Sequence, residues 1–422
     1  MNSVDDPSNL EERLQNQLRL LEQSESLTSD ERQQMCRYFE YLRTETDNGL
    51  QTIFNKVYNL RLLAERSEVP LRELCGLEEV RQFVDDLESG AHPEAPEDGY
   101  ASGTVRNYRT YLRGYFDWLG RDWASEIEIG QPVQTAITGD DLLTREESTG
   151  LVSVENRPRD TALAAGLLAT GQRISAICSL RVRDIDLSSS IGLMRLNDEA
   201  VGLKGASGVR PLMWATPFFR AWKRKHPCAE DDSAPFFCIR EGESVGVDAG
   251  TVLSPRAAHR ALRELAREAD VDPEKVHPHR FRHTAITQMV RDGLGTQQIC
   301  FMVGWKPDST RFQRYSHVSD DEHLRSVLSQ YELTGENSLE VGRPRLSTCR
   351  SCGEDLSNSS DPVECPSCST ILRLSRTAGV SDRNDGRCSS RQEAAQPPQL
   401  DSTILDRIID NNEDYIREYL DN

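Results

Sequence analysis

The stretch from Val276 to Val318 holds the side chains with the most chemistry in this 422-residue chain. His279 and Arg282 are three positions apart, and Trp305 and Tyr315 follow. A helix that begins just before His279 would place it on one face with Arg282, because residues three apart are neighbours on a helix. An imidazole, a guanidinium, an indole N–H and a phenol are together the groups needed to attack a phosphodiester without a metal. The stretch therefore predicts Tyr315 as a nucleophile for phosphoryl transfer.

Two other interpretations of this stretch stay open. His277, His279 and His283 are close enough to suggest a metal site, although the Glu of a His-Glu-x-x-His motif is missing. Tyr315 alone would most often be a packed core residue, and Tyr331 is an alternative nucleophile.

Two further candidates precede this stretch. The almost wholly apolar run Asp160–Thr170 predicts a buried helix, and Arg173 stands where a new helix would start after Gly171. The segment Gly192–Trp214 predicts short strands around a Gly-rich turn, and Lys204 is its one lysine. An ammonium group can give up a proton near neutral pH, whereas a guanidinium cannot. Both residues have the alternative of being ordinary surface side chains.

The order of these groups resembles the catalytic domain of the tyrosine site-specific recombinases, the integrase and Xer group. In that family a Thr-Gly-x-Arg run is followed by a Lys on a β-hairpin, then His-x-x-Arg, Gly-His or Gly-Trp, and the nucleophilic Tyr. The resemblance covers residues 1 to about 332 and is weaker in the first third. It assigns six catalytic residues: Arg173, Lys204, His279, Arg282, Trp305 and Tyr315.

The resemblance also implies their roles. Tyr315 attacks the scissile phosphate and leaves a 3′-phosphotyrosine and a 5′-OH, with His279 as the candidate base. The two arginines grip the non-bridging oxygens, Trp305 donates from its indole N–H, and Lys204 protonates the leaving oxygen. Neither ATP nor a catalytic metal is implied. Two departures from the family pattern are visible: Ala176 replaces the usual acidic residue, and ten positions instead of nine separate the tryptophan from the tyrosine.

The first 122 residues predict a helical bundle, which resembles the core-binding domain that clamps DNA in this family. A Thr28-x-x-Glu31 capping box opens one of its helices. On a later helix, Arg106, Arg109 and Arg113 share one face and are candidate phosphate contacts, with a solvated charged face as the alternative. Residues 123–138 are interpreted as a linker, and residues 139–333 as the catalytic domain.

The C-terminal part predicts a zinc ribbon over residues 343–374. Cys349-x-x-Cys352 and Cys365-x-x-Cys368 can supply four thiolate ligands to one structural zinc ion, with a pair of redox dithiols as the alternative. Residues 375–400 are polar and predict a disordered linker. Residues 401–422 predict an acidic amphipathic helix.

The charge balance indicates adaptation to salt. The net charge is -19, yet only six of the 50 basic residues are lysine. Abundant acidic residues with arginine in place of lysine point to high intracellular salt, and so to a recombinase of haloarchaeal type. At about 1 M salt the Debye length is only ~3 Å, so the net charge does not exclude DNA binding. An ordinary acidic protein is the alternative.

The sequence thus predicts a mainly α fold with a small β-sheet: an N-terminal helical core-binding bundle, an α+β catalytic domain and a C-terminal zinc ribbon. We expect double-stranded DNA as the partner and a homo-tetramer on DNA. Because no apolar run reaches 18 residues and no signal peptide is recognisable, we expect a cytoplasmic protein without a membrane partner. A DNA-binding regulator that keeps the fold without cleaving is the main rival, and a type IB topoisomerase the third interpretation.

Overall fold

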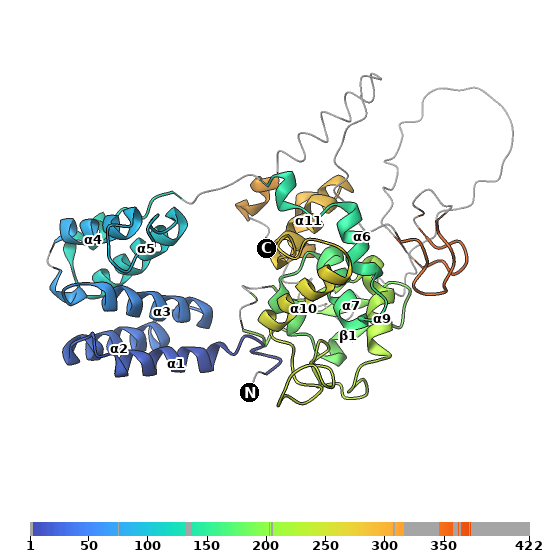
Figure 1. The fold of residues 1–422 in the computed structure, drawn as a ribbon, viewed down its shortest axis with the longest axis horizontal. Coiled ribbons are helices and arrows are strands. Elements are labelled where there is room, and N and C mark those ends of the chain that lie inside the picture. The colour runs from blue at the N-terminus through green and yellow to red at the C-terminus, as the bar shows by residue number, and fades with distance from the viewer. Residues whose placement is uncertain are drawn as a thin grey trace, which may run out of the picture. The chain divides into compact units, whose positions relative to one another are not determined.

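The computed structural model describes residues 3–74, 76–131, 137–201, 203, 206–306, 309–315, 346–357, 362, 364–370 and 372 (Figure 1). The chain divides into two compact units. The first unit contains Asn9–Thr135, and the second contains Asn2–Ser8 together with Ala136–Asn422. Within the described residues, each helix is too short or too polar to cross a membrane.

The first unit is a helical bundle, as predicted. Its helices are α1 (Leu10–Gln23), α2 (Ser29–Thr44), α3 (Leu50–Arg66), α4 (Leu77–Ser89) and α5 (Ser102–Trp118). Helix α3 packs against α1 and α5, and α4 packs against α5. Aromatic side chains fill the core, where the rings of Tyr38 and Tyr115 meet edge to face at 5.3 Å.

The capping box predicted at the start of α2 forms only in part. The Thr28 hydroxyl accepts a hydrogen bond from the Glu31 amide at 3.2 Å. The Glu31 carboxylate, however, accepts from the backbone amide of Leu71 at 2.7 Å and is almost fully buried. A tertiary partner has therefore replaced the local one.

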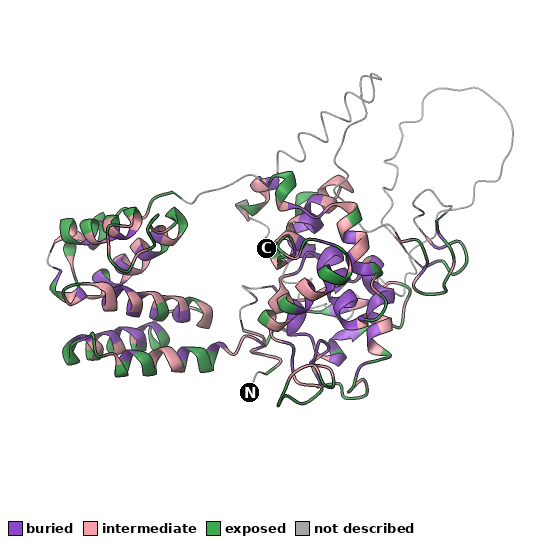
Figure 2. Ribbon diagram, in the orientation of Figure 1, coloured by how far each residue is buried: buried purple, intermediate pink, exposed green. Residues whose placement is uncertain are grey.

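The second unit is mainly helical around one central helix. Its helices are α6 (Arg145–Ser153), α7 (Pro158–Thr170), α8 (Ile174–Cys178), α9 (Thr216–Lys223), α10 (Pro255–Glu268), α11 (Pro278–Arg291) and α12 (Thr296–Val303). Helix α7 packs against α6, α9, α10 and α11. It is buried on all sides from Arg159 to its end (Figure 2), which explains its almost unbroken apolar sequence.

A small antiparallel sheet completes this unit, which confirms the predicted mainly α fold. Its strands are β1 (Ile185–Asp186), β2 (Leu193–Arg195) and β3 (Val209–Pro211), in that order. Met194 pairs with Arg210 in the β2–β3 register. The β2–β3 connection contains the described residues Leu203 and Ala206 and, between them, Lys204, which lies outside the described residues.

The segment Ser3–Ser8 lies with the second unit, although the sequence predicted residues 1–122 as one domain. The carbonyl of Asp5 accepts from the Val201 amide at 2.7 Å. The Asp5 carboxylate accepts from Asn197 at 2.8 Å and from Arg181 at 2.5 Å. These contacts hold the stem of the β2–β3 connection.

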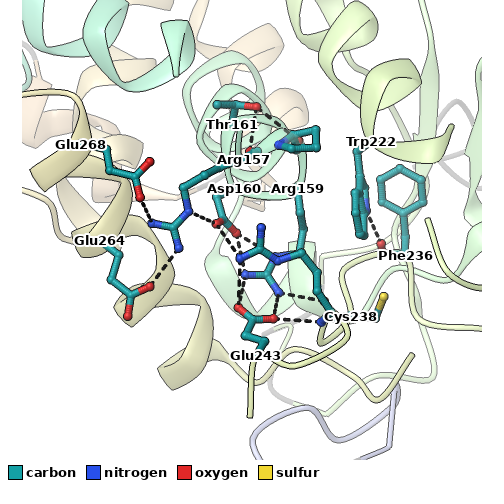
Figure 3. Close-up of polar contacts among 12 residues, drawn as sticks. Arg157, Arg159, Asp160, Thr161, Trp222, Phe236, Cys238, Glu243, Glu264 and Glu268 are labelled. Carbon is teal, nitrogen blue, oxygen red and sulfur yellow. Dashed lines mark hydrogen bonds and ion pairs between the residues drawn. The ribbon is translucent and has the colours of Figure 1, made fainter. Parts of the chain in front are cut away.

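A buried ionic network fixes the N-terminal end of α7 (Figure 3). The fully buried Arg159 guanidinium donates to the carboxylates of Asp160 and Glu243 and, at 2.9 Å, to the carbonyl of Cys238. Arg157 pairs with Asp160 at 2.9 Å and with Glu264 of α10 at 2.9 Å. The network joins α7 to α10 and to the loop that carries Glu243. It thereby stabilises the helix whose other end leads to Arg173.

Candidate active site

The turn after α7 places Arg173 beside Arg282 of α11. Gly171 ends α7 with φ +62, a conformation that favours glycine, and a Cβ there would lie 3.0 Å from Val303. Arg282 donates to the carbonyl of Gly171 at 2.6 Å and to that of Val303 at 3.0 Å. The Gln172 amide donates to the carbonyl of Met302 at 2.5 Å. Three segments, the ends of α7 and α12 and the middle of α11, are thus joined at one point.

The two guanidinium groups form a cationic site. Burial and the neighbouring Arg173 lower the pKa of Arg282 to about 9, and burial together with Arg311 lowers the pKa of Arg173. In the part of the chain that the structure describes, neither arginine forms an ion pair, and the buried Nη2 of Arg282 has no hydrogen-bond partner. A buried cation without a counter-ion is costly. The arrangement therefore suits an anionic ligand with several oxygens, such as a phosphodiester.

Trp305 and its preceding glycine connect this site to the β2–β3 connection. The Arg282 guanidinium lies over the Trp305 ring at 5.2 Å, and the Trp305 and Tyr315 rings are 6.1 Å apart. Gly304 has φ +67, and a Cβ there would lie 2.6 Å from the Cβ of Ala206. Arg173 also donates to the carbonyl of Leu203 at 3.4 Å. The described residues on either side of Lys204 therefore contact the site.

Tyr315 ends the short 3₁₀ helix η6 (Thr310–Tyr315) and is only 2% exposed. Its phenolic oxygen lies 2.5 Å from Nδ1 of His283. Burial raises the pKa of Tyr315 to about 12, although Arg282 and Arg314 oppose the shift. A phenol with so high a pKa must lose its proton to a base, or be activated by nearby positive charge, before it can attack phosphorus.

His279 lies one helical turn before His283 on α11, and their ring centroids are 6.3 Å apart. Its backbone amide donates to Nδ1 of His277 at 3.3 Å, and the two rings stack at 5.6 Å. The structure thus gathers Arg173, Arg282, Trp305 and Tyr315, with His279 at the edge of the cluster. The sequence predicts His283 only as a possible metal ligand, so its contact with Tyr315 is a new finding. Its place directly after the Arg of His-x-x-Arg was the available signal.

The histidine run does not form a metal site. Among the described residues, the one group of His, Cys, Asp or Glu side chains arranged to hold a metal is the four-cysteine cluster. The histidine rings instead contact one another in series, from His259 of α10 through His277, the cap of α11, to His279 and His283 on α11. The metal alternative for this stretch is therefore not supported.

The three arginines of α5 are placed differently from one another. Arg109 is paired with Asp85 at 3.2 Å and with Glu88 at 2.8 Å. Arg106 donates to the carbonyl of Gly130 at 3.3 Å. Arg113 is half-buried. The two carboxylates that pair with Arg109 favour the alternative of a charged surface face for that residue over phosphate contact.

The four cysteines at the C-terminal end lie within 4.8 Å of one another. The sulfurs of Cys349 and Cys368 are 3.6 Å apart, as are those of Cys352 and Cys365. A disulfide would require about 2.05 Å. Four thiolates around one metal ion at about 2.3 Å would be about 3.8 Å apart, so the cluster fits a tetrahedral metal site.

The first cysteine pair is anchored to the body of the second unit. Arg350, which lies between Cys349 and Cys352, donates to the carbonyls of Val152 and Ser153 at 3.4 and 3.2 Å. Its guanidinium also lies 5.9 Å from the centre of the Phe218 ring. The loop that would bind the metal is therefore connected to the end of α6.

Known proteins resemble this chain both in sequence and in fold. Residues 142–322 match the phage integrase family. The chain is 26% identical over 240 residues to tyrosine recombinase XerA of Thermococcus kodakarensis, which covers 56% of this chain and 78% of that relative. It is 27% identical over 259 residues to tyrosine recombinase XerC of Bacillus licheniformis, with the same coverage. A crystal structure of the XerH site-specific recombinase bound to palindromic difH substrate aligns with a TM-score of 0.48 and 14% identity, over 78% of this chain and 97% of that chain.

Proposed function

We propose that this protein, a site-specific DNA recombinase of the tyrosine class by its phage integrase domain and its Xer relatives, cleaves and rejoins DNA through Tyr315. One observation carries the assignment of the site. Among the residues that the structure describes, Arg173 and Arg282 converge without a counter-ion beside a buried tyrosine, and Nη2 of Arg282 has no hydrogen-bond partner. A phosphodiester would supply the missing acceptors.

The chemistry follows from the groups in place. The phenolic oxygen of Tyr315 attacks the phosphorus and expels the 5′-oxygen, so that the 3′-phosphate becomes joined to the tyrosine. Arg173 and Arg282 bind the non-bridging oxygens and stabilise the additional charge of the pentavalent state. Trp305 donates its indole N–H to the same phosphate. His279, at the edge of the cluster, assists the proton transfers.

Lys204 is the proposed acid for the 5′-oxygen. Leu203 and Ala206, its described neighbours along the chain, contact Arg173 and Gly304 respectively, which supports a place for the lysine near the phosphate. Its ammonium group would give one proton to the leaving oxygen and receive it back when the strand is rejoined. The energy of the broken ester stays in the phosphotyrosine, so the mechanism uses neither ATP nor a catalytic metal.

The proposed recombinase function also implies the partners, and the cysteine cluster implies the metal. Double-stranded DNA is the substrate, and because strand exchange involves two duplexes, we propose a tetramer on DNA. The four cysteines would hold a structural zinc ion, for which the sulfur spacing is suitable. The scarcity of lysine supports a recombinase of haloarchaeal type, and a DNA substrate supports a cytoplasmic location.

The test is a trapped intermediate. A nicked duplex made from the DNA that flanks the gene loses its short 5′ fragment after cleavage, so the protein should remain covalently attached and appear as an adduct on a denaturing gel. The adduct should form in EDTA and without ATP, at low salt or in molar KCl. Tyr315→Phe should abolish it while duplex binding persists, because phosphate contacts dominate binding. Tyr331→Phe is the matched control and should leave the adduct unchanged.

One result would favour the rival function. A wild-type protein that binds this duplex under both salt conditions but never forms the adduct would be a DNA-binding regulator with a recombinase fold.

A further inference from the structure

The hydrogen bond between Tyr315 and His283 places an imidazole on the atom that reacts. The distance from the phenolic oxygen to Nδ1 is 2.5 Å, and the two rings are tilted by 42° with their centres 5.8 Å apart. Tyr315 comes from η6 and His283 from α11, so two separate elements meet at this bond. It joins buried groups, because Tyr315 is 2% exposed and His283 is half-buried.

The groups around His283 set its protonation state. Arg314 faces it from η6, His279 and Arg282 from its own helix, and Asp141 from the 3₁₀ turn η3 (Gly139–Asp141). Burial and the neighbouring Arg314 lower the pKa of His283 to about 4, so the ring is neutral at neutral pH. A neutral imidazole with its proton on Nε2 offers a lone pair at Nδ1. In this tautomer the phenol is the donor and His283 the acceptor.

We propose that His283 is the base that accepts the proton of Tyr315 during cleavage and returns it during rejoining. The inference rests on the recombinase function proposed above. It assigns the base to His283 instead of to His279, which comes one turn earlier on α11 and whose ring stacks on His277.

The step balances without any further reagent. The O–H bond of Tyr315 breaks and its proton moves to Nδ1 of His283, while the phenolic oxygen bonds to phosphorus. The bond from phosphorus to the 5′-oxygen breaks. That oxygen keeps the electron pair of the bond and takes a proton from Lys204. In rejoining, the 5′-hydroxyl gives its proton to the neutral amine of Lys204 and bonds to phosphorus. The bond from phosphorus to the phenolic oxygen breaks, and the imidazolium returns its proton to that oxygen.

Substrate binding should strengthen the base. The cations near His283 disfavour its protonated form while no anion is present, because like charges repel. A bound phosphodiester would neutralise part of the charge of Arg282 and so make the imidazolium easier to form. The imidazole would therefore become a better proton acceptor only when the scissile phosphate is in place.

The first measurement does not depend on activity. In the full-length protein at pH 7, long-range ¹⁵N–¹H correlation spectra should show the Nε2–H tautomer for His283. Tyr315→Phe removes the donor and should shift the Nδ1 resonance. A proton on Nδ1 in the wild-type protein would overturn the proposal, whatever the outcome for cleavage.

The second measurement is the single-turnover cleavage rate on the nicked duplex. His283→Ala should slow cleavage by roughly 10²–10⁴-fold, the usual contribution of a positioned base, with duplex binding and thermal unfolding close to wild type. In that variant the rate should rise about tenfold per pH unit, because only ionised tyrosine reacts, whereas the wild-type rate should be level near neutral pH. Added imidazole should restore part of the rate. His259→Ala, a histidine of α10 bonded to the carbonyl of Val276, is the matched control.

His283→Asn separates proton transfer from positioning. The Asn oxygen is attached to Cγ, as Nδ1 is in histidine, so it can accept the hydrogen bond but cannot hold the proton near neutral pH. We expect this variant to be as slow as His283→Ala. A rate equal to that of the wild type would reduce His283 to a positioning residue, and a His283→Ala rate within threefold of the wild type would remove its role. If the wild type formed no adduct at all, the proposed recombinase function would be wrong. The tautomer measurement would still show whether Tyr315 or His283 donates the hydrogen bond.

Discussion

Gly304 and Ala206 lie so close that no side chain fits between them. A Cβ on Gly304 would lie 2.6 Å from the Cβ of Ala206 and 3.5 Å from its Cα. The turn that carries Trp305 is therefore pressed against the connection that carries Lys204. Because the Cβ of an alanine is fixed by its own backbone, rotation of a side chain cannot relieve the 2.6 Å contact.

We predict that Gly304→Ala slows cleavage while duplex binding persists, because the added methyl group displaces the connection from Arg173. The left-handed φ of +67 adds a cost of about 1 kcal/mol for any other residue. Gly120→Ala is the matched control, since Gly120 has φ +71 but open space around it. If both variants lose the same stability and only Gly304→Ala loses cleavage, the steric contact is the cause. Equal cleavage by both would contradict this.

The pair Arg159–Glu243 should make the second unit sensitive to acid. Burial opposes ionisation of Glu243, but the hydrogen bonds from Arg159 lower its pKa from 4.5 to about 2. A lowered folded-state pKa adds stability above pH 4.5, and this contribution is lost as the pH falls toward 2. We predict that Glu243→Gln lowers the free energy of unfolding at pH 7 by on the order of 3 kcal/mol, and by much less near pH 2.

The comparison can be made by urea denaturation at several pH values. Glu241→Gln, an exposed glutamate two positions earlier, is the control and should leave the stability unchanged. A difference between wild type and Glu243→Gln that stays constant from pH 7 to pH 2.5 would contradict the ionic explanation.

The sequence was sufficient for contacts that depend on local spacing. Thr144 and Glu147 have the spacing of a capping box, and this box forms with both of its hydrogen bonds. His279 and Arg282 lie on one helix, as their spacing predicts. The two Cys-x-x-Cys pairs also come together. In each case the residues are fixed by one turn or by a short loop, so their spacing carries the information.

The sequence was not sufficient where a partner comes from a distant segment. The carboxylate of Glu31 binds the amide of Leu71, 40 residues later, in place of its local partner. His283 and Tyr315 are 32 residues apart and meet only because η6 folds back on α11. Such contacts depend on how the elements pack, and periodicity within an element does not report that packing.

The metal site should affect the stability of the second unit. Elemental analysis should find about one zinc per chain, and none in Cys352→Ser purified in parallel. Because Arg350 lies between two of the cysteines and binds the end of α6, loss of the metal should lower the unfolding temperature of the body of this unit. Arg350→Ala should still bind zinc, but removal of the metal should then change the unfolding temperature much less. Zinc-free wild-type protein, purified without chelators, would exclude the ribbon.

The last prediction concerns the acid. Lys204→Arg should impair cleavage and leave duplex binding nearly intact, because the positive charge is kept while the transferable proton is lost. A substrate with a sulfur atom as the 5′ leaving group needs no protonation, so it should restore the rate of Lys204→Arg close to that of the wild type. The same substrate should not rescue His283→Ala, because that variant lacks the acceptor for the proton of Tyr315. Lys306→Arg, a substitution of the same kind beside Trp305, is the control for charge and size. Failure of the sulfur substrate to rescue Lys204→Arg would mean that another group protonates the 5′-oxygen.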